Sequence, residues 1–287
     1  MIPRPFEYHA PSALPDVIAL LDRYGDEAKL LAGGHSLLPM MKLRFAGPAH
    51  LIDLRKVAAL KGITLVGDEV HIGAMTTENE LIFSSLLAEK LPLLAETARQ
   101  IADPQVRYRG TIGGDVSHGD PGNDHPAVML ALAARLVLTG AAGERLVAAE
   151  DFFLGTFETA LTPGEVLTQI RIPVPGAGTG AAYAKLKRKT GDYATAAAAV
   201  VVRVQNGVCA AARIALTNVG PTALLAADAA QSLVGKAMDD AAIEDAAARA
   251  MAICAPAADL RGDEKYKTAM AGQMVERALR SALSRAQ

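Results

Sequence analysis

The sequence predicts an α+β fold, and three observations support this prediction. Hydrophobic residues make up 51% of the 287 residues, which is enough for a large buried core. Apolar runs that flank short turn sequences recur along the chain, and this pattern is typical of antiparallel hairpins. The segment 222–285 is different, because it is rich in alanine and has helical character, with about three helices expected.

The first part of the chain, residues 1–54, is expected to form a small α/β subdomain. Apolar residues recur at helical spacing over 14–24, and a proline and an aspartate suit the first turn of that helix. Short strands are expected at 29–31 and at 50–54.

Residues 55–177 are expected to form a second α/β subdomain that contains two hairpins. Gly67-Asp68 separates the apolar runs of the first hairpin, and the segment 140–143 separates those of the second. The segment 77–101 is mostly helical in character, and Pro92 is expected to divide it into two helices. The strands expected here are 63–66, 70–72, 135–139, 145–148 and 166–172.

The third part, residues 178–287, begins within a stretch rich in proline and glycine at 173–180, which marks the expected boundary. Its strands at 196–204 and 208–216 flank an Asn-Gly pair, and this pair favours a type I′ turn. We therefore expect an antiparallel sheet followed by a small helical bundle.

Charge and hydropathy exclude several classes of function. The formal net charge is -2 and no basic block occurs, so nucleic acid is not an expected partner. The apolar run 194–204 is far shorter than the roughly 20 residues of a membrane-spanning helix. Residues 1–8 contain no apolar leader segment, so a cytoplasmic location is expected.

The two cysteines, Cys209 and Cys254, do not form a C-x-x-C pair. An iron–sulfur cluster usually takes four thiolate ligands, and a cysteine-rich structural zinc site needs a similar set. Neither type of site is expected in this chain, and both cysteines are interpreted as small buried hydrophobic residues.

A first glycine segment, Ala32-Gly33-Gly34-His35-Ser36, follows the strand expected at 29–31. Paired glycines can adopt positive φ, which turns successive N–H groups toward one point and favours an anion. Ser36 adds a hydroxyl and could cap a helix over 37–43. The alternative is an ordinary tight turn, with His35 as a simple loop residue.

A second glycine segment, Thr111-Ile112-Gly113-Gly114-Asp115, offers the same groups. Alone, it too could be an ordinary turn. Two anion-binding turns about 80 residues apart suit a ligand with two phosphates that is held from two sides. A dinucleotide diphosphate fits this description.

Two other motifs are given plainer interpretations. The segment 176–181 matches G-x-G-x-x-A, but it lacks the preceding strand and following helix of a dinucleotide-binding fingerprint, so we interpret it as a linker. The segment 118–125 contains two histidines and two aspartates, but their spacing matches no zinc or calcium pattern. It is interpreted as a rigid polar loop, and no metal-binding residue is nominated.

The two glycine segments resemble the pyrophosphate loops of the FAD-binding medium subunits of molybdenum hydroxylases, the xanthine dehydrogenase superfamily. These subunits have the vanillyl-alcohol-oxidase (PCMH-type) FAD-binding fold. The resemblance covers the whole chain, and the stretches 101–105, 119–124 and 185–194 are most similar to the carbon monoxide dehydrogenase branch.

The resemblance implies a fold, a cofactor and partners. Two α/β subdomains would grip FAD and a C-terminal domain of antiparallel sheet and helical bundle would close over it. Expected partners are a small subunit with [2Fe-2S] clusters and a large subunit with a molybdenum–copper pterin site, assembled as a dimer of heterotrimers. A quinone-linked acceptor could make a peripheral contact. No catalytic side chain is nominated, because the cofactor performs the redox chemistry.

Three alternatives stay open at this point. The chain could be the flavin subunit of a related hydroxylase that acts on xanthine, nicotinate or an aldehyde. It could be a stand-alone FAD oxidoreductase, which would need a substrate pocket of its own. It could also be a nucleotide-binding assembly module that transfers no electrons.

The resemblance assigns cofactor-binding roles residue by residue. Position 115 often carries Asn in the family. Because a carboxylate aimed at phosphate would repel it, the side chain of Asp115 is expected to face the ribose or backbone donors, or to point away, and to leave the phosphates to N–H groups. Arg107 and Arg109 are interpreted as residues of a solvated loop or subunit surface and are left out of the site. The residues expected on the diphosphate are Ala32, Gly33, Gly34, His35, Ser36, Thr111, Gly113, Gly114 and Asp115.

Five further residues are assigned around the rest of the cofactor. Ser117 and Asp124 would lie on the loop after the second glycine segment, with Asp124 toward the ribose or adenine. Leu161 would contact the adenine, and Lys185 would lie near the polar edge of the flavin. Tyr193 would cover one flavin face, or else be an ordinary packed strand residue.

Overall fold

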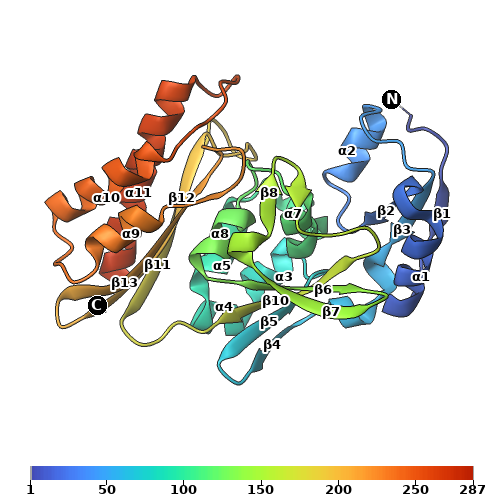
Figure 1. Cartoon of the computed structure of the whole chain (residues 1–287), viewed down its shortest axis with the longest axis horizontal. Helices are drawn as coiled ribbons and strands as arrows, with labels where there is room; N and C mark the ends of the chain where they lie inside the picture. The colour runs from blue at the N-terminus through green and yellow to red at the C-terminus, as the bar shows by residue number, and fades with distance from the viewer. Residues whose placement is uncertain (1, 287) are drawn as a thin grey trace.

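The computed structural model of the chain describes residues 2–286 and contains three main β-sheets that lie side by side (Figure 1). The sheets divide the chain into an N-terminal, a middle and a C-terminal part, at the right, centre and left of Figure 1. No helix within these residues is both long and apolar enough to cross a membrane.

The N-terminal part has a three-stranded parallel sheet in the order β1-β3-β2. The predicted helix and both predicted strands are confirmed, whereas β1 had no sequence signal. Val17 and Ile52 are fully buried in its small core, which continues into the middle part through Met75 and Val166. The elements are β1 (Glu7–His9), α1 (Leu14–Tyr24), β2 (Ala28–Leu31), α2 (Leu37–Lys42) and β3 (His50–Asp53).

The middle part has a five-stranded antiparallel sheet in the order β4-β5-β10-β6-β7 and a separate pair, β8-β9. Both predicted hairpins are confirmed. The strands are β4 (Ile63–Val66), β5 (Glu69–Gly73), β6 (Arg135–Gly140), β7 (Gly143–Ala148), β8 (Phe153–Gly155), β9 (Glu158–Thr159) and β10 (Val166–Pro173).

The helices of the middle part gather on one side of its sheet (Figure 1). The prediction of two helices over 77–101 is wrong, because there are three. Ser84 is extended and its hydroxyl accepts a hydrogen bond from Leu87 N at 3.2 Å, so it caps a new helix before Pro92 starts the next. The helices are α3 (Glu78–Phe83), α4 (Ser85–Lys90), α5 (Pro92–Gln100), α6 (Pro104–Arg109), α7 (Ile112–His118) and α8 (His125–Ala131).

The C-terminal part has an antiparallel sheet in the order β11-β12-β13-β14, covered on one face by three helices, as predicted. Asn206 and Gly207 both have positive φ, as a type I′ turn requires. The elements are β11 (Thr179–Leu186), β12 (Ala196–Gln205), β13 (Val208–Thr217), β14 (Leu224–Leu225), α9 (Ala227–Leu233), α10 (Asp240–Ala252) and α11 (Glu264–Arg285).

The central strand β12 joins two cores. Ala197 and Ala199 face the core of the middle part, whereas Ala198 and Val200 face the core under α9, α10 and α11. Because both faces are covered, the strand is a continuous apolar run rather than an alternating one. The C-terminal sheet is therefore packed between the middle part and its own helices, and the α+β prediction is confirmed.

Candidate functional site

The two glycine segments are in contact, although the 74 residues 37–110 lie between them in the sequence. A Cβ placed on Gly33 would lie 2.6 Å from the carbonyl oxygen of Arg109 and 2.8 Å from Cα of Gly110. A Cβ on Gly114 would lie 3.3 Å from Cβ of Ala32. Only glycine allows the backbones to approach this closely, so the contact explains why both segments contain it.

The first glycine segment retains several free backbone donors. Gly34 has a φ of 82°, in the left-handed region that the sequence analysis expected. Within residues 2–286, the amides of Gly33, Gly34, His35 and Ser36 donate to no other backbone group. His35 is exposed, so these donors lie at an accessible edge. Such a run of free donors suits an anion.

The expected cap by Ser36 is wrong. Ser36 precedes α2, but its backbone is helical, at φ -101° and ψ -54°, and its side chain makes no capping hydrogen bond. A capping side chain normally needs an extended backbone to reach the amides of the next turn. The hydroxyl of Ser36 is therefore not used by the helix.

The second glycine segment is the first turn of α7 rather than a loop. Neither of its glycines has positive φ, so the expectation of a second turn with the backbone geometry of the first is wrong. The amide of Gly113 donates to the carbonyl of Ala74 at 2.9 Å, and that of Gly114 donates to Thr111 Oγ1 at 3.2 Å. A Cβ on Gly113 would lie 2.4 Å from Cβ of Ala74. Glycine is needed here for close packing.

Thr111 is the group of the second segment that can still donate. Its side chain accepts from Gly114 N as the cap of α7, and a hydroxyl that accepts one hydrogen bond keeps its own proton to donate. Thr111 is 4% exposed. The free amides of the first segment and this hydroxyl fit a diphosphate laid along the contact between the segments.

Asp115 lies next to this contact as a half-buried residue, and one of its carboxyl oxygens is shielded from solvent. Its Oδ1 has no solvent contact and no hydrogen-bond partner among the described residues. Burial raises the pKa of its carboxyl to about 8, and the nearby charges of Glu78 and Asp124 add to the rise while His125 opposes it. At pH 7 the group is therefore mostly a neutral acid, which removes the repulsion of phosphate that a carboxylate would cause.

His125 and Glu78 form a buried ion pair that the sequence analysis missed. His125 Nε2 lies 2.8 Å from a carboxylate oxygen of Glu78, and the side chains are 0% and 2% exposed. Burial alone would lower the pKa of His125, but the charge and hydrogen bond of Glu78 raise it to about 9. The histidine starts α8 instead of lying in a polar loop, and 47 residues separate the two partners.

Asp124 is held by two residues of the C-terminal sheet. Its Oδ2 is 2.6 Å from Lys185 Nζ, and its Oδ1 accepts a hydrogen bond from Tyr183. The side chains of Lys185 and Asp124 are 1% and 6% exposed. Tyr183 also contacts Thr217 Oγ1 at 3.4 Å. Tyr183 and Thr217 were not predicted, because nothing in the sequence places β11 and β13 beside residue 124.

The remaining predicted residues occupy different surroundings. Tyr193 is 45% exposed and lies between β11 and β12, so it is not a packed strand residue. A Cβ on Gly122 would lie 3.2 Å from the Tyr193 ring, and the guanidinium of Arg261 lies 5.6 Å from the centre of that ring.

Ser117 lies inside α7 rather than on a loop, which corrects its expected position. Leu161 packs partly buried against the middle core.

Arg107 also departs from its expected position. Its Nη1 donates to the carbonyl of Ile101 at 2.8 Å, and its Nε is buried with no partner among residues 2–286. The side chain is thus turned into the protein, whereas Arg109 is exposed as expected.

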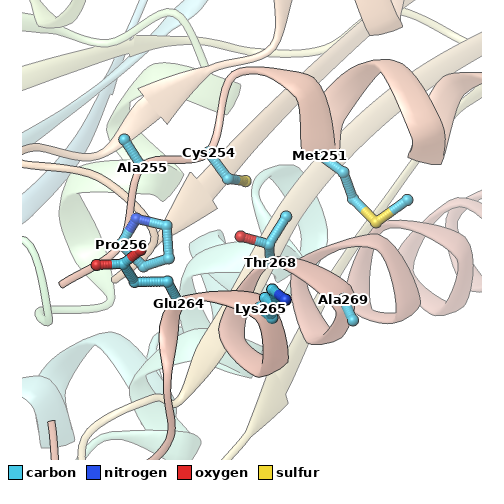
Figure 2. Close-up of a pocket in the computed structure, with 8 residues that line it drawn as sticks. All are labelled: Met251, Cys254, Ala255, Pro256, Glu264, Lys265, Thr268 and Ala269. Atoms are coloured by element: carbon cyan, nitrogen blue, oxygen red, sulfur yellow. The ribbon is translucent and has the colours of Figure 1, made fainter. Parts of the chain in front are cut away.

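A hollow between α10 and α11 has a different character (Figure 2). It has a volume of about 410 Å³ and is bordered by Met251, Cys254 and Thr268, among others. Burial raises the pKa of the Cys254 thiol to about 11, so the thiol stays protonated and is a poor nucleophile or ligand. This hollow offers no cluster of reactive groups.

Comparisons with known proteins agree with this arrangement. Residues 4–175 match the family model described as the FAD binding domain in molybdopterin dehydrogenase, and residues 181–282 match the CO dehydrogenase flavoprotein C-terminal domain. The chain is 59% identical to the carbon monoxide dehydrogenase medium chain of Hydrogenophaga pseudoflava, covering 99% of both chains. It is 55% identical to the medium chain of Afipia carboxidovorans, covering 100% of this chain and 99% of that one.

Solved structures show the same likeness. A chain of carbon monoxide dehydrogenase from Hydrogenophaga pseudoflava superposes with a TM-score of 0.98 at 60% identity, covering 99% of both chains. A chain of quinoline 2-oxidoreductase from Pseudomonas putida 86 gives 0.94 at 35% identity, covering 100% of both. The chain therefore belongs to the family of FAD-binding subunits of molybdopterin dehydrogenases, with the CO dehydrogenase flavoprotein type of C-terminal domain.

Proposed function

We propose that the chain binds FAD and transfers electrons within a carbon monoxide dehydrogenase. It would receive electrons from the [2Fe-2S] clusters of a small subunit and pass them to an external acceptor. The identities of 59% and 55% to carbon monoxide dehydrogenase medium chains support this activity. Relatives named for xanthine and nicotinate are 29% and 31% identical, which makes a related hydroxylase the weaker alternative.

The contact between the two glycine segments is the observation that carries the FAD assignment. We propose that the diphosphate lies along this contact, where it accepts hydrogen bonds from the free amides of residues 33–36 and from the Thr111 hydroxyl. Ala32, Gly113 and Gly114 would shape this surface by close packing rather than by donating. Bound FAD supplies the redox chemistry, and the chain supplies position and electrostatics.

The other proposed contacts are at the junction of the middle and C-terminal parts. Asp124 would hold the Lys185 ammonium beside the flavin's polar edge, because its 2.6 Å ion pair fixes that side chain. Tyr193 would cover one flavin face, consistent with its partly exposed ring beside Gly122. Neutral Asp115 and Ser117 would face the ribose side, and Leu161 the adenine.

We propose that three domains, 1–54, 55–177 and 178–287, act as two gripping units and a cover. One main sheet in each range supports this division.

The proposal includes a large subunit with a molybdenum–copper pterin site, a dimer of heterotrimers, a quinone-linked acceptor and a cytoplasmic location. Cell fractionation followed by FAD absorbance of the purified complex tests the location and the assembly.

The FAD assignment is tested by Gly33→Ala in the purified complex. The added Cβ would meet the Arg109 carbonyl at 2.6 Å and push the two segments apart. We expect the FAD content per complex to fall at least severalfold, measured by flavin absorbance after denaturation. Gly176→Ala is the control, because nothing lies within 4 Å of its added Cβ. Full FAD content in Gly33→Ala would refute the proposed diphosphate position.

Metal analysis of the complex tests the substrate assignment. Copper together with molybdenum, and carbon monoxide oxidation with an artificial acceptor, are the expected results. Molybdenum without copper, with turnover of a purine, nicotinate or an aldehyde, would instead favour the related hydroxylases. Turnover of a small reductant by this chain alone would favour a stand-alone oxidoreductase.

A further inference from the structure

The guanidinium of Arg107 is half-buried and has no counter-charge among the described residues. Nη1 donates to the carbonyls of Ile101 and Ala102, at 2.8 and 3.4 Å. Nε has no solvent contact and no partner among the described residues, and no carboxylate of residues 2–286 lies within ion-pair distance of the side chain. A donor that is shielded from water and has no partner is costly, and this guanidinium has no anion beside it, so the geometry points to a negative group that the chain does not itself supply.

Two lysines add to the positive charge at the same place. Lys185 and Lys187 from β11 and its following loop donate to the carbonyl of Gln100, at 3.4 and 3.1 Å. Three cations thus gather on three consecutive carbonyls, those of Gln100, Ile101 and Ala102. Asp124 neutralises one of them, by its ion pair with Lys185. Burial lowers the pKa of Lys187, and the charges of Lys185 and Arg107 lower it further.

This cluster lies at a different junction from the glycine segments. The glycine segments join the N-terminal part to the middle part, as the contact of Gly33 with Arg109 shows. The cation cluster joins the middle part to the C-terminal part, where Gly191 lies against Ala102 near the Tyr193 loop. A dinucleotide cofactor has its diphosphate in one region and its redox-active ring in another. The two junctions suit these two regions.

We propose that Arg107 and Lys187 form a cationic subsite for the polar edge of the flavin ring, and that they stabilise the reduced, anionic form of the cofactor. This inference rests on the proposed function, and it adds two residues that act on the ring rather than on the diphosphate. Arg107 is a positioning and charge-supplying residue here, and it takes no part in proton transfer.

The charge balance explains why such a subsite affects the redox potential. Uptake of two electrons and one proton by neutral flavin leaves one negative charge on the ring, and the electrons come from two reduced iron–sulfur clusters, each oxidised by one electron. A nearby cation binds this anion more tightly than the neutral oxidised ring. The difference in affinity raises the midpoint potential of the bound flavin.

The test is a redox titration of the flavin in the purified complex that carries Arg107→Met. We expect a tenfold or greater loss of preference for the reduced form, which is a fall of about 30 mV or more for a two-electron couple. Lys187→Met should lower the potential in the same direction. Arg107→Lys keeps the charge and should restore most of the potential.

Two exposed cations provide matched controls. Arg109→Met removes a charge from the same helix, and Lys189→Met removes one from the same loop as Lys187. Both should leave the potential unchanged, because exposed charges are screened by solvent. An equal fall in Arg109→Met would show a general charge effect and would overturn the proposal.

The outcomes separate this inference from the function on which it rests. If the unmodified complex binds no FAD, the proposed function itself fails. If Arg107→Met and Lys187→Met retain FAD at an unchanged potential, only this inference fails. Reduced FAD content at an unchanged potential would assign the cations to the diphosphate and would also overturn it. If Arg107→Met does not assemble, Lys187→Met and Arg107→Lys decide the question.

Discussion

At the scale of the residue, burial and a charged partner distant in the sequence determine the protonation of Asp115 and His125, near the glycine segments. Asp115 has a pKa of about 8 because it lacks water, and His125 has a pKa of about 9 because it is paired with Glu78. Both values lie above those of exposed groups. The folded chain therefore holds protons that the unfolded chain would release as the pH rises.

Asp115→Asn is expected to remove a pH dependence of stability. The usual pKa of this carboxyl is 3.8, so between pH 4 and 8 the unfolded chain binds fewer protons than the folded chain, and stability falls as the pH rises. The slope is at most about 1.4 kcal/mol per pH unit. Chemical denaturation between about pH 4.5 and 5.5 isolates the contribution of Asp115 to this slope, because His125 is then protonated in both the folded and the unfolded chain.

Asp68→Asn is the control for this measurement, because Asp68 is exposed in a hairpin turn. The slope of its free energy of unfolding against pH should equal that of the unmodified chain. An unchanged slope in Asp115→Asn would mean that Asp115 is ionised in the folded chain.

Lys185→Met is expected to destabilise the chain by about 3–5 kcal/mol, because it leaves the carboxylate of Asp124 buried without its cation. Thermal or chemical unfolding measures the loss. Lys189→Met is an exposed control and should change stability by less than about 0.5 kcal/mol. The double variant with Asp124→Asn should lose less than the sum of the single losses, and additive losses would contradict the coupling.

At the scale of the element, local signals predicted most helices and strands but not α6, α7 or α8. The Gly113-Gly114 pair was interpreted as an anion-binding turn or an ordinary tight turn, because paired glycines can adopt positive φ. The structure uses these glycines inside a helix so that its first turn can lie directly on Ala74 and beside Ala32. Packing between neighbouring elements outweighed the local preference.

Gly113→Ala is therefore expected to destabilise the protein although alanine favours helices. The added Cβ would lie 2.4 Å from Cβ of Ala74, which forces α7 away from β5 and costs about 1–3 kcal/mol. The midpoint of thermal unfolding is the measurement. Gly176→Ala, in open space, should be neutral or slightly stabilising. A stabilised Gly113→Ala would show that α7 does not pack against Ala74.

At the scale of the whole molecule, the C-terminal sheet couples two cores. Ala199 on β12 belongs to the middle core, whereas Ala198 beside it belongs to the core under the C-terminal helices. The ion pair between Arg285 on α11 and Glu96 on α5 spans the same junction. These contacts give the middle and C-terminal parts a shared stability.

Ala199→Asp is expected to destabilise both parts together. A carboxyl at this buried position would have no partner, at a cost of several kcal/mol. Hydrogen exchange should speed up in β10 of the middle part and in α11 of the C-terminal part alike. Ala211→Asp, on the exposed face of β13, is the matched control and should change neither. Faster exchange confined to the C-terminal part would show that the two parts unfold independently.

The sequence by itself determined the features that depend on neighbouring residues. The Asn206-Gly207 turn, the helix at 14–24 and the strand pairs of the middle part follow from local backbone preference and apolar spacing. The glycine segments marked where the site lies. Only the tertiary structure decided which groups meet there, because the pairs Glu78–His125 and Asp124–Lys185 are 47 and 61 residues apart. The pKa of Asp115 likewise depends on burial and on the charges of Glu78, Asp124 and His125, which no local pattern encodes.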